Sequence, residues 1–439
     1  VLWPGAALAG ELDNSVANLA LGIAAQPGLG VWTLRDAEGD PDGLGRLEQL
    51  VVDGHPLHPC CRTREGMTTE EVLAYAPEHR NVVRLRRLAV PRELWRGDGD
   101  PILLAHPWQA ARLLAEFPWL RDVGATGPMR PLMSLRTFAP LDGGPHVKTA
   151  VDVRMTSAVR TVSPAAVHNG PRLSALLTEL TSDLDTLHIL REIAAGHVVV
   201  DGVPQRRMAH LIREAPRPHD DEAIVPLGAL AAGGAVRKTA VGKSGAREGM
   251  AEEGAVGESA TGRGGGSLIE QAVARAGGDP YRWLEDLVSI WLPPLLRVLD
   301  RGVALEAHGQ NTLVGLRRGR PVRVFYRDFG GVRVRDDAHG LIGDLPCDDP
   351  DELRRKLAAG ALGTVAYEVV TLLRRRLGAD PGRLWGIVAA AIRSSGTADA
   401  EKLLAEPLPV KATTAMRLAV EPLDDVWCHL QNPMTRGAR

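Results

Sequence analysis

One short segment, GHPLHPCCRTREG at 54–66, concentrates side chains that can do chemistry. Two His-Pro pairs begin at His55 and His58, and two adjacent cysteines then precede two arginines, the first of which is Arg62. A closed zinc site usually needs two ligand pairs at short spacing, and no second pair follows in the sequence. A redox site would need a C-x-x-C spacing or a thiol of low pKa. The segment by itself therefore favours either an anion-facing loop or a buried His-Pro turn bonded to the backbone.

A second group of polar residues lies in EAHGQNTLVGLRRGRPVRVFYRDFGGV at 306–332. NTLVGL and VRVFYRDF have strand-like composition and are joined by RRGRP, which predicts a β-hairpin. Folding about that turn brings Asn311 close to Asp328, with Glu306 and His308 just outside the same end. Hard oxygen ligands of this kind suit Mg²⁺ that is bound together with phosphates. The hairpin mouth is therefore a candidate magnesium site.

Two further runs alternate between polar and apolar residues, as strands do. The run at 132–138 places Ser134 and Arg136 on one face. The run at 147–157 has an apolar face and a polar face that carries Lys148, Asp152, Arg154 and Thr156. Such a strand is typical of the wall of a polar cleft, and equally of an ordinary solvated sheet face.

The composition bounds the kind of protein that these residues belong to. With 439 residues, 44% hydrophobic and 24% charged, the chain is typical of a globular protein with two or three domains. The net charge of −2 provides no general attraction to nucleic acid or membrane. Its most apolar run, at 287–299, is interrupted by Pro293 and Pro294 and is shorter than the ~18 residues of a membrane span. Four cysteines make no disulfide framework, and no leader pattern is present at the N-terminus, so we expect a cytoplasmic protein.

The elements that must position the site are mixed helices and strands, which predicts an α+β fold. Residues 232–266 are rich in glycine, alanine, serine and charge, and predict a flexible linker between two parts of the chain. Helical periodicity appears at 11–25, 106–117, 172–194 and 280–301, and across most of 351–430.

Eight segments occur in an order that matches a known family. They are NSVANLALGIA (14–24), GHPLHPCCRTREG (54–66), HPWQ (106–109), SLRTF (134–138), TSAVRTVSP (156–164), EAHGQNTLV (306–314), RDFGG (327–331) and VKATTAMRL (410–418). Together they resemble the NRPS-independent siderophore synthetases, in particular the aerobactin-synthetase-like IucA/IucC group. Each motif is weak alone, and the eight in order are specific.

The resemblance implies a cupped hand of thumb, fingers and palm. It assigns 1–48 to a remnant of the thumb, 49–231 to the fingers, 232–266 to the linker and 267–439 to the palm. Because the N-terminal region is shorter than in the family, the thumb is expected to be truncated. The family's homodimers imply that this chain forms a homodimer.

The activity that the resemblance implies is an ATP-dependent acid–amine ligation in siderophore biosynthesis. Such an enzyme uses ATP and Mg²⁺ to activate a carboxylate of citrate, or of a citrate- or succinate-derived acid, as an acyl-adenylate. An amine or hydroxylamine then attacks, which gives an amide or hydroxamate with AMP and pyrophosphate as the other products. No nucleic acid or membrane partner is expected.

The family's motifs also imply roles for individual residues. ATP is expected to contact His55, His58, Arg62, Ser134, Arg136, Thr137 and Lys148. The carboxylates of the acid are expected to contact Thr156, Arg160 and His308, and Mg²⁺ to contact Glu306, Asn311 and Asp328. The charges that act in catalysis would be those of Arg136, Lys148, Arg160 and His308. Position 62 departs from the family, which has lysine there, and the two side chains are not equivalent donors.

Two other functions are compatible with parts of the sequence. HGQN followed by RDFGG at 308–331 resembles kinase loops in which Asn and Asp hold Mg²⁺, although no Gly-rich phosphate loop precedes it. This would make the chain a small-molecule phosphotransferase. A degenerate synthetase homologue that binds a partner or an acid without turnover is the other alternative.

Overall fold

The computed structural model describes residues 4–233, 266–335, 340–419 and 425–437. The predicted linker at 232–266 lies almost wholly outside these described residues. Its two flanks lie side by side, because Gly233 and Ser267 form an antiparallel bridge.

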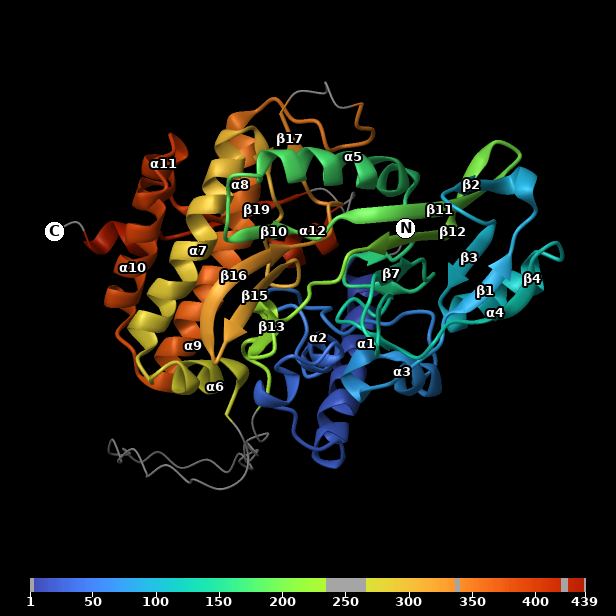
Figure 1. Cartoon of the computed structure of the whole chain (residues 1–439), viewed down its shortest axis with the longest axis horizontal. Helices are drawn as coiled ribbons and strands as arrows, with labels where there is room; N and C mark the ends of the chain where they lie inside the picture. Colours follow the sequence, from blue (N-terminus) through green and yellow to red (C-terminus); the bar gives the residue numbers. More distant parts are fainter. Residues whose placement is uncertain (1–3, 234–265, 336–339, 420–424, 438–439) are drawn as a thin grey trace.

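A four-stranded sheet carries the predicted hairpin, in the order β10-β16-β15-β13 (Figure 1). Its strands are β10 (Leu187–Ile189), β13 (Glu222–Pro226), β15 (Thr312–Arg317) and β16 (Arg320–Tyr326). The hairpin of β15 and β16 is confirmed; it turns through Arg318 and Gly319, whose φ angles of 50° and 84° are those of a tight two-residue turn. β10 and β13 precede the predicted linker, so one sheet unites strands from both sides of it. The largest hydrophobic core likewise contains residues from both sides of the linker.

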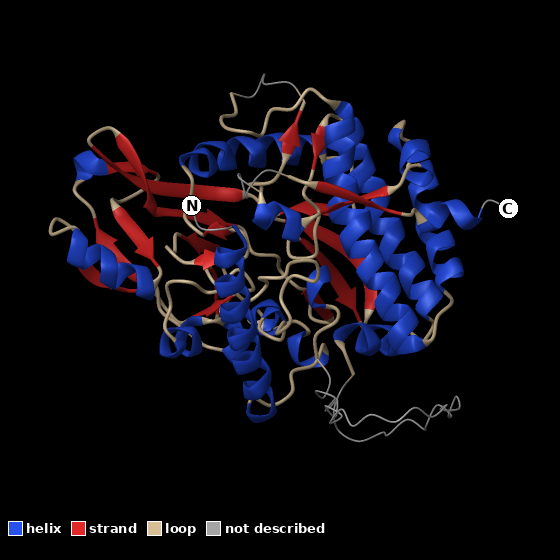
Figure 2. Ribbon diagram, turned by 180° about the vertical axis from the view of Figure 1, so that it is seen from behind, coloured by secondary structure: helices blue, strands red, loops and turns tan. Residues whose placement is uncertain are grey.

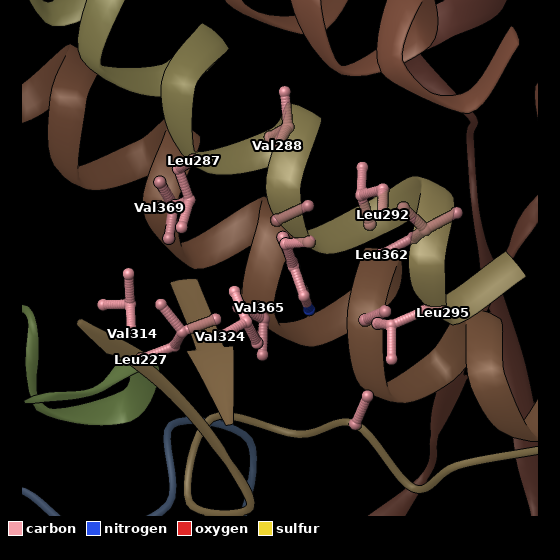
Figure 3. Packing of buried hydrophobic residues seen from close by; sticks show 14 of the residues in the cluster. Leu227, Leu287, Val288, Leu292, Leu295, Val314, Val324, Leu362, Val365 and Val369 are labelled. Atoms are coloured by element: carbon pink, nitrogen blue, oxygen red, sulfur yellow. The ribbon is translucent and has the colours of Figure 1, made fainter. Parts of the chain in front are cut away.

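The two faces of this sheet are both apolar and both covered. On one face Leu313, Phe325 and Ile224 pack with Leu44 of the short helix α2 (Gly43–Glu48). On the other face the neighbouring strand residues face a layer of helices, as the alternation of a strand requires. Figure 3 shows Val314 and Val324 beneath helix residues such as Leu287 and Val365.

The helical layer contains most of the chain after 266 (Figure 1). Its helices are α6 (Leu268–Arg275), α7 (Pro280–Asp300), α8 (Pro350–Gly360), the π-helical turn η6 (Ala361–Ala366), α9 (Tyr367–Leu377), α10 (Pro381–Ser394) and α11 (Asp399–Ala405). α7 packs on β16 and α10 packs on α7. The layer is held by apolar burial, with Trp283, Trp291 and their neighbours almost fully removed from solvent.

One continuous helix in this layer, Pro350–Leu377, is long and apolar enough by length and composition to cross a membrane. The most apolar window of the helix has a mean hydropathy of 1.3, and 72% of it is buried inside the fold. That burial is typical of a helix in the core of a protein.

The N-terminal part is built on a six-stranded sheet in the order β2-β11-β12-β7-β6-β5, which reaches toward a separate three-stranded sheet β3-β1-β4 (Figures 1 and 2). The strands of the first are β2 (Trp95–Gly97), β5 (Met129–Pro131), β6 (Thr137–Pro140), β7 (His146–Thr149), β11 (Glu192–Val200) and β12 (Val203–Arg213). The strands of the second are β1 (Arg86–Ala89), β3 (Ile102–Ala105) and β4 (Arg121–Ala125). The helices of this part are α1 (Pro4–Ala25), α3 (Thr69–Tyr75), α4 (Pro107–Glu116) and α5 (Pro164–Leu180).

Short elements complete the described chain. Three two-stranded ribbons are formed by β8 (Arg154–Met155) with β9 (Ala158–Val159), β14 (Val303–Ala304) with β17 (Arg333–Val334), and β18 (Leu408–Lys411) with β19 (Trp427–Leu430). Helix α12 (Thr413–Leu418) follows β18 directly. The helices predicted at 11–25, 106–117 and 280–301 are confirmed, and α7 continues through Pro293 and Pro294 instead of breaking there.

Several predicted elements are wrong in detail. The run at 132–138 is mainly a turn between β5 and β6, because Leu135 has a φ of 63°. Only the start of the run at 147–157 belongs to β7; the chain leaves the six-stranded sheet after Thr149, and Arg154 and Met155 form the separate short strand β8. The helix predicted over 172–194 ends at Leu180, where the chain turns into β10 and β11. The prediction that most of 351–430 is helical is confirmed, and the short strands β18 and β19 lie within that range. In these runs the apolar periodicity of the sequence continues beyond the end of the element, and the turn that ends the element is set by tertiary packing.

A carboxyl group on α9 gives the fold a predictable pH dependence. Desolvation, and then the negative charge of Asp53, raise the pKa of Glu368 to about 7. The unfolded chain ionises this group near its ordinary value, so folding loses stability as the pH rises from about 4.5 to 7. We expect Glu368→Gln to raise the free energy of unfolding at pH 8 by roughly 1–3 kcal/mol, after allowance for solvent screening.

Chemical denaturation of the wild type and of Glu368→Gln at pH 4.5 and pH 8 measures this difference. The two proteins should be nearly equally stable at the lower pH. Equal stability at pH 8 as well would contradict the assigned burial of this carboxylate.

Candidate active site

An ion pair joins the two parts of the chain at the mouth of the hairpin. Lys148 Nζ of β7 lies 2.7 Å from Asp328 Oδ2, two residues beyond the end of β16. Burial alone would raise the pKa of Asp328, but the charges of Lys148, Arg213 and Arg136 hold it far below its ordinary value. Asp328 is therefore a carboxylate, held in a left-handed backbone conformation with a φ of 69°.

Two arginines lie beside this pair. Arg136 Nη1 donates to the carbonyl oxygens of Thr161, at 2.6 Å, and Arg160, at 3.2 Å. Arg160 donates to Thr156 Oγ1. Desolvation, and then the neighbouring Arg160, lower the pKa of Arg136 to about 10, so its guanidinium stays charged at neutral pH. The residues predicted to bind phosphate and acid thus form one cationic group near Asp328.

A cleft opens where these residues meet the hairpin. It is small and polar, and it is lined by Glu48, Leu132, Ser134, Thr137, Arg213, Gln310, Asn311, Arg327 and Asp328. Ser134 and Thr137 therefore face the same space as Asn311 and Asp328, as the predictions require. The hairpin end is held by a bond from the Arg327 amide to the Asn311 carbonyl, at 3.0 Å.

The His-Pro pairs share one local structure. In each, the Nδ1 atom of histidine accepts the amide hydrogen of the residue after the proline: Leu57 for His55, Cys60 for His58 and Trp108 for His106. An accepting Nδ1 leaves the proton of a neutral ring on Nε2. Nε2 of His58 therefore donates to Ser157 Oγ, at 2.7 Å. Of the two alternatives for this segment, the turn bonded to the backbone is present at both histidines, and it is buried at His58 but exposed at His55.

The loop that carries these turns lies against the C-terminal part of the chain. Thr413 Oγ1 of α12 donates to the Leu57 carbonyl. Desolvation, then His308 and His58, lower the pKa of His55. Burial, then Arg417 and Arg160, lower the pKa of His58 to about 4, so both rings are neutral at pH 7. Within the described residues, no three His, Cys, Asp or Glu side chains gather as a metal site, so the zinc interpretation finds no support there.

Arg62 does not face the cleft, contrary to prediction. Its guanidinium is buried and donates to the carbonyl oxygens of Val51 and of Val52, the latter at 2.6 Å, while Nη1 lies 3.4 Å from Glu78 Oε2. These contacts hold the chain before and after the loop together. The predicted role of Arg62 in binding ATP is replaced by a structural one, because the guanidinium bonds inward.

A second charged network surrounds Glu306. Glu306 Oε1 is 3.2 Å from Lys356 Nζ and 3.4 Å from Lys411 Nζ, and both ammonium groups also contact Asp425, at 3.3 and 2.8 Å. His308 Nε2 is 3.9 Å from Glu306 Oε2. Burial would raise the pKa of Glu306, but Lys356, His308 and Lys411 lower it to about 2. Glu306 is therefore ionised and already neutralised by lysines.

The predicted magnesium residues fit a metal that arrives with its phosphates better than a resident one. Asp328 is paired with Lys148, Glu306 is paired with two lysines, and Asn311 Nδ2 lies 3.4 Å from the Glu306 carbonyl. The three residues stand at one end of the hairpin but form no preassembled cage. Mg²⁺ commonly takes only one or two protein carboxylates together with substrate phosphates and water, and this arrangement is compatible with that use.

Several charged residues of the site were not predicted. Lys411 lies in VKATTAMRL, Lys356 follows two arginines in the charged first half of α8, and Arg213 ends the strand β12. Glu192 of β11 is another, since burial raises its pKa to about 7 beside Lys148 and Asp328. The available signal was a charged residue within a helix or strand, which also occurs at many surface positions.

Comparison with known proteins supports a family assignment. A model described as the IucA / IucC family matches residues 44–101 and 95–232, and a model described as a ferric iron reductase FhuF-like transporter matches residues 281–421. Over 67% of its length this chain is 27% identical to staphyloferrin A synthase of Staphylococcus aureus. Over 78% it is 28% identical to aerobactin synthase of Escherichia coli. Over residues 44–232 the chain is thus similar to the IucA / IucC family, and the relatives that it matches are named as siderophore synthases.

Solved structures place this chain in the family's fold. The ATP-bound aerobactin synthetase IucA of Klebsiella pneumoniae gives a TM-score of 0.75 at 20% identity over 97% of this chain and 82% of that one. The petrobactin biosynthesis protein AsbB of Bacillus anthracis also gives 0.75, at 18% identity over 90% of this chain and 75% of that one. The mixed α+β architecture is thereby confirmed. The boundaries of thumb, fingers and palm remain predictions.

The match to family members is partial in length. The chain spans 53% of staphyloferrin A synthase and 66% of aerobactin synthase, and 76% of the rhizobactin siderophore biosynthesis protein RhbC of Rhizobium meliloti, to which it is 26% identical. Activity, substrates and partners are therefore matters for proposal. The two matched regions each contain one residue of the central ion pair. Lys148 lies in the region matched by the IucA / IucC model, and Asp328 lies in the region matched by the FhuF-like model.

The structural role of Arg62 can be tested by restoring the lysine that the family has. Lysine cannot reproduce the three separate bonds of a planar guanidinium. We expect Arg62→Lys to lower the free energy of unfolding by about 1–3 kcal/mol and to leave ATP affinity unchanged. Denaturant titration and ATP-binding calorimetry measure the two quantities.

Arg121→Lys, at an exposed position of β4, is the matched control and should change neither quantity. A large loss of ATP affinity in Arg62→Lys at unchanged stability would restore the cleft role that the sequence predicted.

Proposed function

We propose that this protein is an ATP-dependent acid–amine ligase of siderophore biosynthesis. It would adenylate a carboxylate of citrate, or of a citrate- or succinate-derived acid, and condense it with an amine or hydroxylamine. The main observation in support of the proposal is the ion pair between Lys148 and Asp328. It places an ammonium group, of the kind that binds phosphate, next to a carboxylate that lines the cleft. Charges from opposite parts of the chain converge there.

The chemistry of adenylation explains why the cleft needs this many cations. A carboxylate and a triphosphate repel each other, so a site must neutralise both and hold them in line. On the N-terminal side, Lys148 and Arg136 offer charge, and Ser134 and Thr137 offer hydroxyl groups, to the phosphates of ATP. Arg136 can bind two oxygens at once, whereas Lys148 is a compact point charge.

The acid would lie toward the C-terminal side of the same cleft. Arg160 and Thr156 are already joined by a hydrogen bond, and His308 lies across from them beside Glu306. Lys411 adds an ammonium group that a carboxylate can reach, since a third of its side chain remains accessible. We propose these residues as the contacts of the substrate carboxylates.

The reaction would proceed in two displacements. An oxygen of the substrate carboxylate attacks the α-phosphorus of ATP, the bond to the β-phosphate oxygen breaks, and pyrophosphate leaves. The substrate nitrogen then attacks the acyl carbon, loses a proton, and AMP leaves with the electron pair of the acyl–oxygen bond. Lys148, Arg136 and Arg160 would stabilise negative charge on oxygens in both steps without forming a covalent bond.

Mg²⁺ bound with ATP would neutralise phosphate charge, and Asp328, Asn311 and Glu306 are the residues that would hold it. Release of Asp328 from Lys148 on metal binding would free the ammonium group for phosphate. The names of relatives support the nucleotide and the acid: one structural neighbour is an ATP-bound aerobactin synthetase, and two relatives are citrate ligases of Staphylococcus aureus acting with L-2,3-diaminopropanoate and D-ornithine.

The same resemblance leads us to propose a cytoplasmic homodimer that acts on small molecules and binds neither nucleic acid nor membrane. Light scattering of the purified protein tests the dimer, which would have twice the 47.0 kDa of one chain.

Product analysis tests the proposed reaction. The protein is mixed with Mg-ATP and each of a panel of carboxylic acids that includes citrate and succinate, with and without hydroxylamine. We expect pyrophosphate and AMP with at least one acid, and a hydroxamate when hydroxylamine is present. ADP as the product would favour the phosphotransferase, and no turnover with any acid would favour the non-catalytic homologue.

The role of Lys148 is tested by substitution. We expect Lys148→Ala to lower kcat for pyrophosphate release by about 10²–10³-fold, because a charge aimed at the phosphates is lost. Lys402→Ala, at an exposed lysine of α11, is the matched control and should keep wild-type rates. Full activity in Lys148→Ala, in protein with wild-type circular dichroism, would remove this residue from the site.

A further inference from the structure

The helix at 350–377 changes from α-helical to π-helical geometry next to the residues proposed to bind the acid. α8 ends at Gly360, a π-helical turn follows over Ala361–Ala366, and α9 continues from Tyr367. The hydroxyl of Thr364 donates to the carbonyl of Ala359, five residues earlier, at 2.8 Å. π-helical turns are rare and occur often at functional sites, where they alter which side chains a helix presents.

One face of this helix contacts both segments that carry residues proposed to bind the acid: the loop with Glu306 and His308, and the strand β18 with Lys411. Lys356, Gly360 and Gly363 are spaced by four and three residues, which places them on a common face. Lys356 contacts Glu306, and a Cβ atom added to Gly360 would lie 3.1 Å from the amide nitrogen of Ala307. The loop that carries Glu306 and His308 therefore rests directly on the helix backbone.

Gly363 meets the other segment, the strand β18. A Cβ atom there would lie 2.3 Å from the carbonyl oxygen of Pro409 and 2.8 Å from Val410 Cγ1. Real Cβ atoms do not approach a backbone oxygen this closely, so any side chain at 363 would displace β18. Lys411 is the last residue of that strand, and its ammonium group lies 3.4 Å from Glu306.

We propose that Gly363 is a positioning residue for the acid-binding part of the site, with Gly360 in a supporting role. Because both segments rest on one helix face without intervening side chains, the helix sets the separation of Lys411 from Glu306 and His308. β18 pairs only with β19 among the described strands, so no larger sheet would hold Lys411 in place if the strand moved. This inference rests on the proposed function for its substrate.

A merely structural glycine would behave differently. If Gly363 only improved packing, alanine there would lower stability and affect all substrates alike. If it positions Lys411, the effect should fall mainly on the acid, because Lys411 contacts Glu306 and Asp425, whereas Lys148, proposed for the ATP phosphates, pairs with Asp328.

The first test is kinetic. Gly363→Ala should raise KM for the acid by about tenfold or more, since an ångström of misplacement is costly. KM for Mg-ATP, whose metal Glu306 would help to hold, should rise by less, because Glu306 keeps its ion pair with Lys356. Gly386→Ala is the matched control, because Gly386 lies inside α10 with no atom within 4 Å of an added Cβ. An unchanged KM for the acid, or equal increases for acid and ATP, would overturn the proposal.

The second test does not need an active enzyme. Brief acetylation of the folded protein, followed by peptide mass spectrometry, measures the accessibility of Lys411 relative to the exposed Lys402. We expect Gly363→Ala, but not Gly386→Ala, to raise the relative labelling of Lys411 by about threefold, as expected when an ion pair is lost. Unchanged labelling would overturn the positioning role whether or not the wild type turns over.

The two tests separate the two proposals. If the wild type releases no pyrophosphate but Lys411 becomes more reactive in Gly363→Ala, the proposed function fails and the positioning role stands. If Gly363→Ala does not fold, Gly360→Ala takes its place. Its contacts of 3.1–3.2 Å require only a small shift, and the same increase in Lys411 labelling, at smaller size, is expected.

Discussion

Burial of charge in the cleft is the constraint on which the rest of this structure depends. A charged group removed from water is costly unless a partner compensates it, and here the partners come from distant parts of the chain. Lys148 stands 180 residues before Asp328, and Lys356 and Lys411 meet Glu306 from a helix and a strand. Each of these partly buried charges is compensated by a counter-charge from a distant segment.

Glycines position these charged groups, because they allow neighbouring backbone segments to approach closely. The loop at 306–311 is enclosed by glycines: a Cβ on Gly331 would lie 1.9 Å from Glu306 Oε2, and one on Gly309 would lie 2.6 Å from the amide nitrogen of Gly228. On the helix at 350–377, Gly360 allows a close approach of Ala307 and Gly363 allows a close approach of Pro409. Such close approaches leave little freedom for the loop, and they explain why a charged network can keep its geometry next to an open cleft.

The similarity to solved synthetases is consistent with this distribution of constraints. TM-scores of 0.71–0.75 persist at 18–24% identity, so most positions have changed while the arrangement of elements has been kept. Apolar cores tolerate replacement when volume and pattern are kept, whereas a buried ion pair fails when one partner is lost. Arg62 illustrates a third case, in which charge is retained at a structural position but the bonding differs from that of lysine.

The sequence by itself determined the hairpin of β15 and β16, the helices with a strong apolar period, and the residue types of the cleft. These depend on local patterns, such as the Arg318–Gly319 turn and the histidine that accepts the amide after its proline. Tertiary structure decided where the run at 132–138 turns, that Arg62 bonds inward, and that Lys356 and Lys411 join Glu306. The physical reason is that buried charges find their partners through long-range packing, and no spacing along the chain records which distant segment will supply the counter-charge.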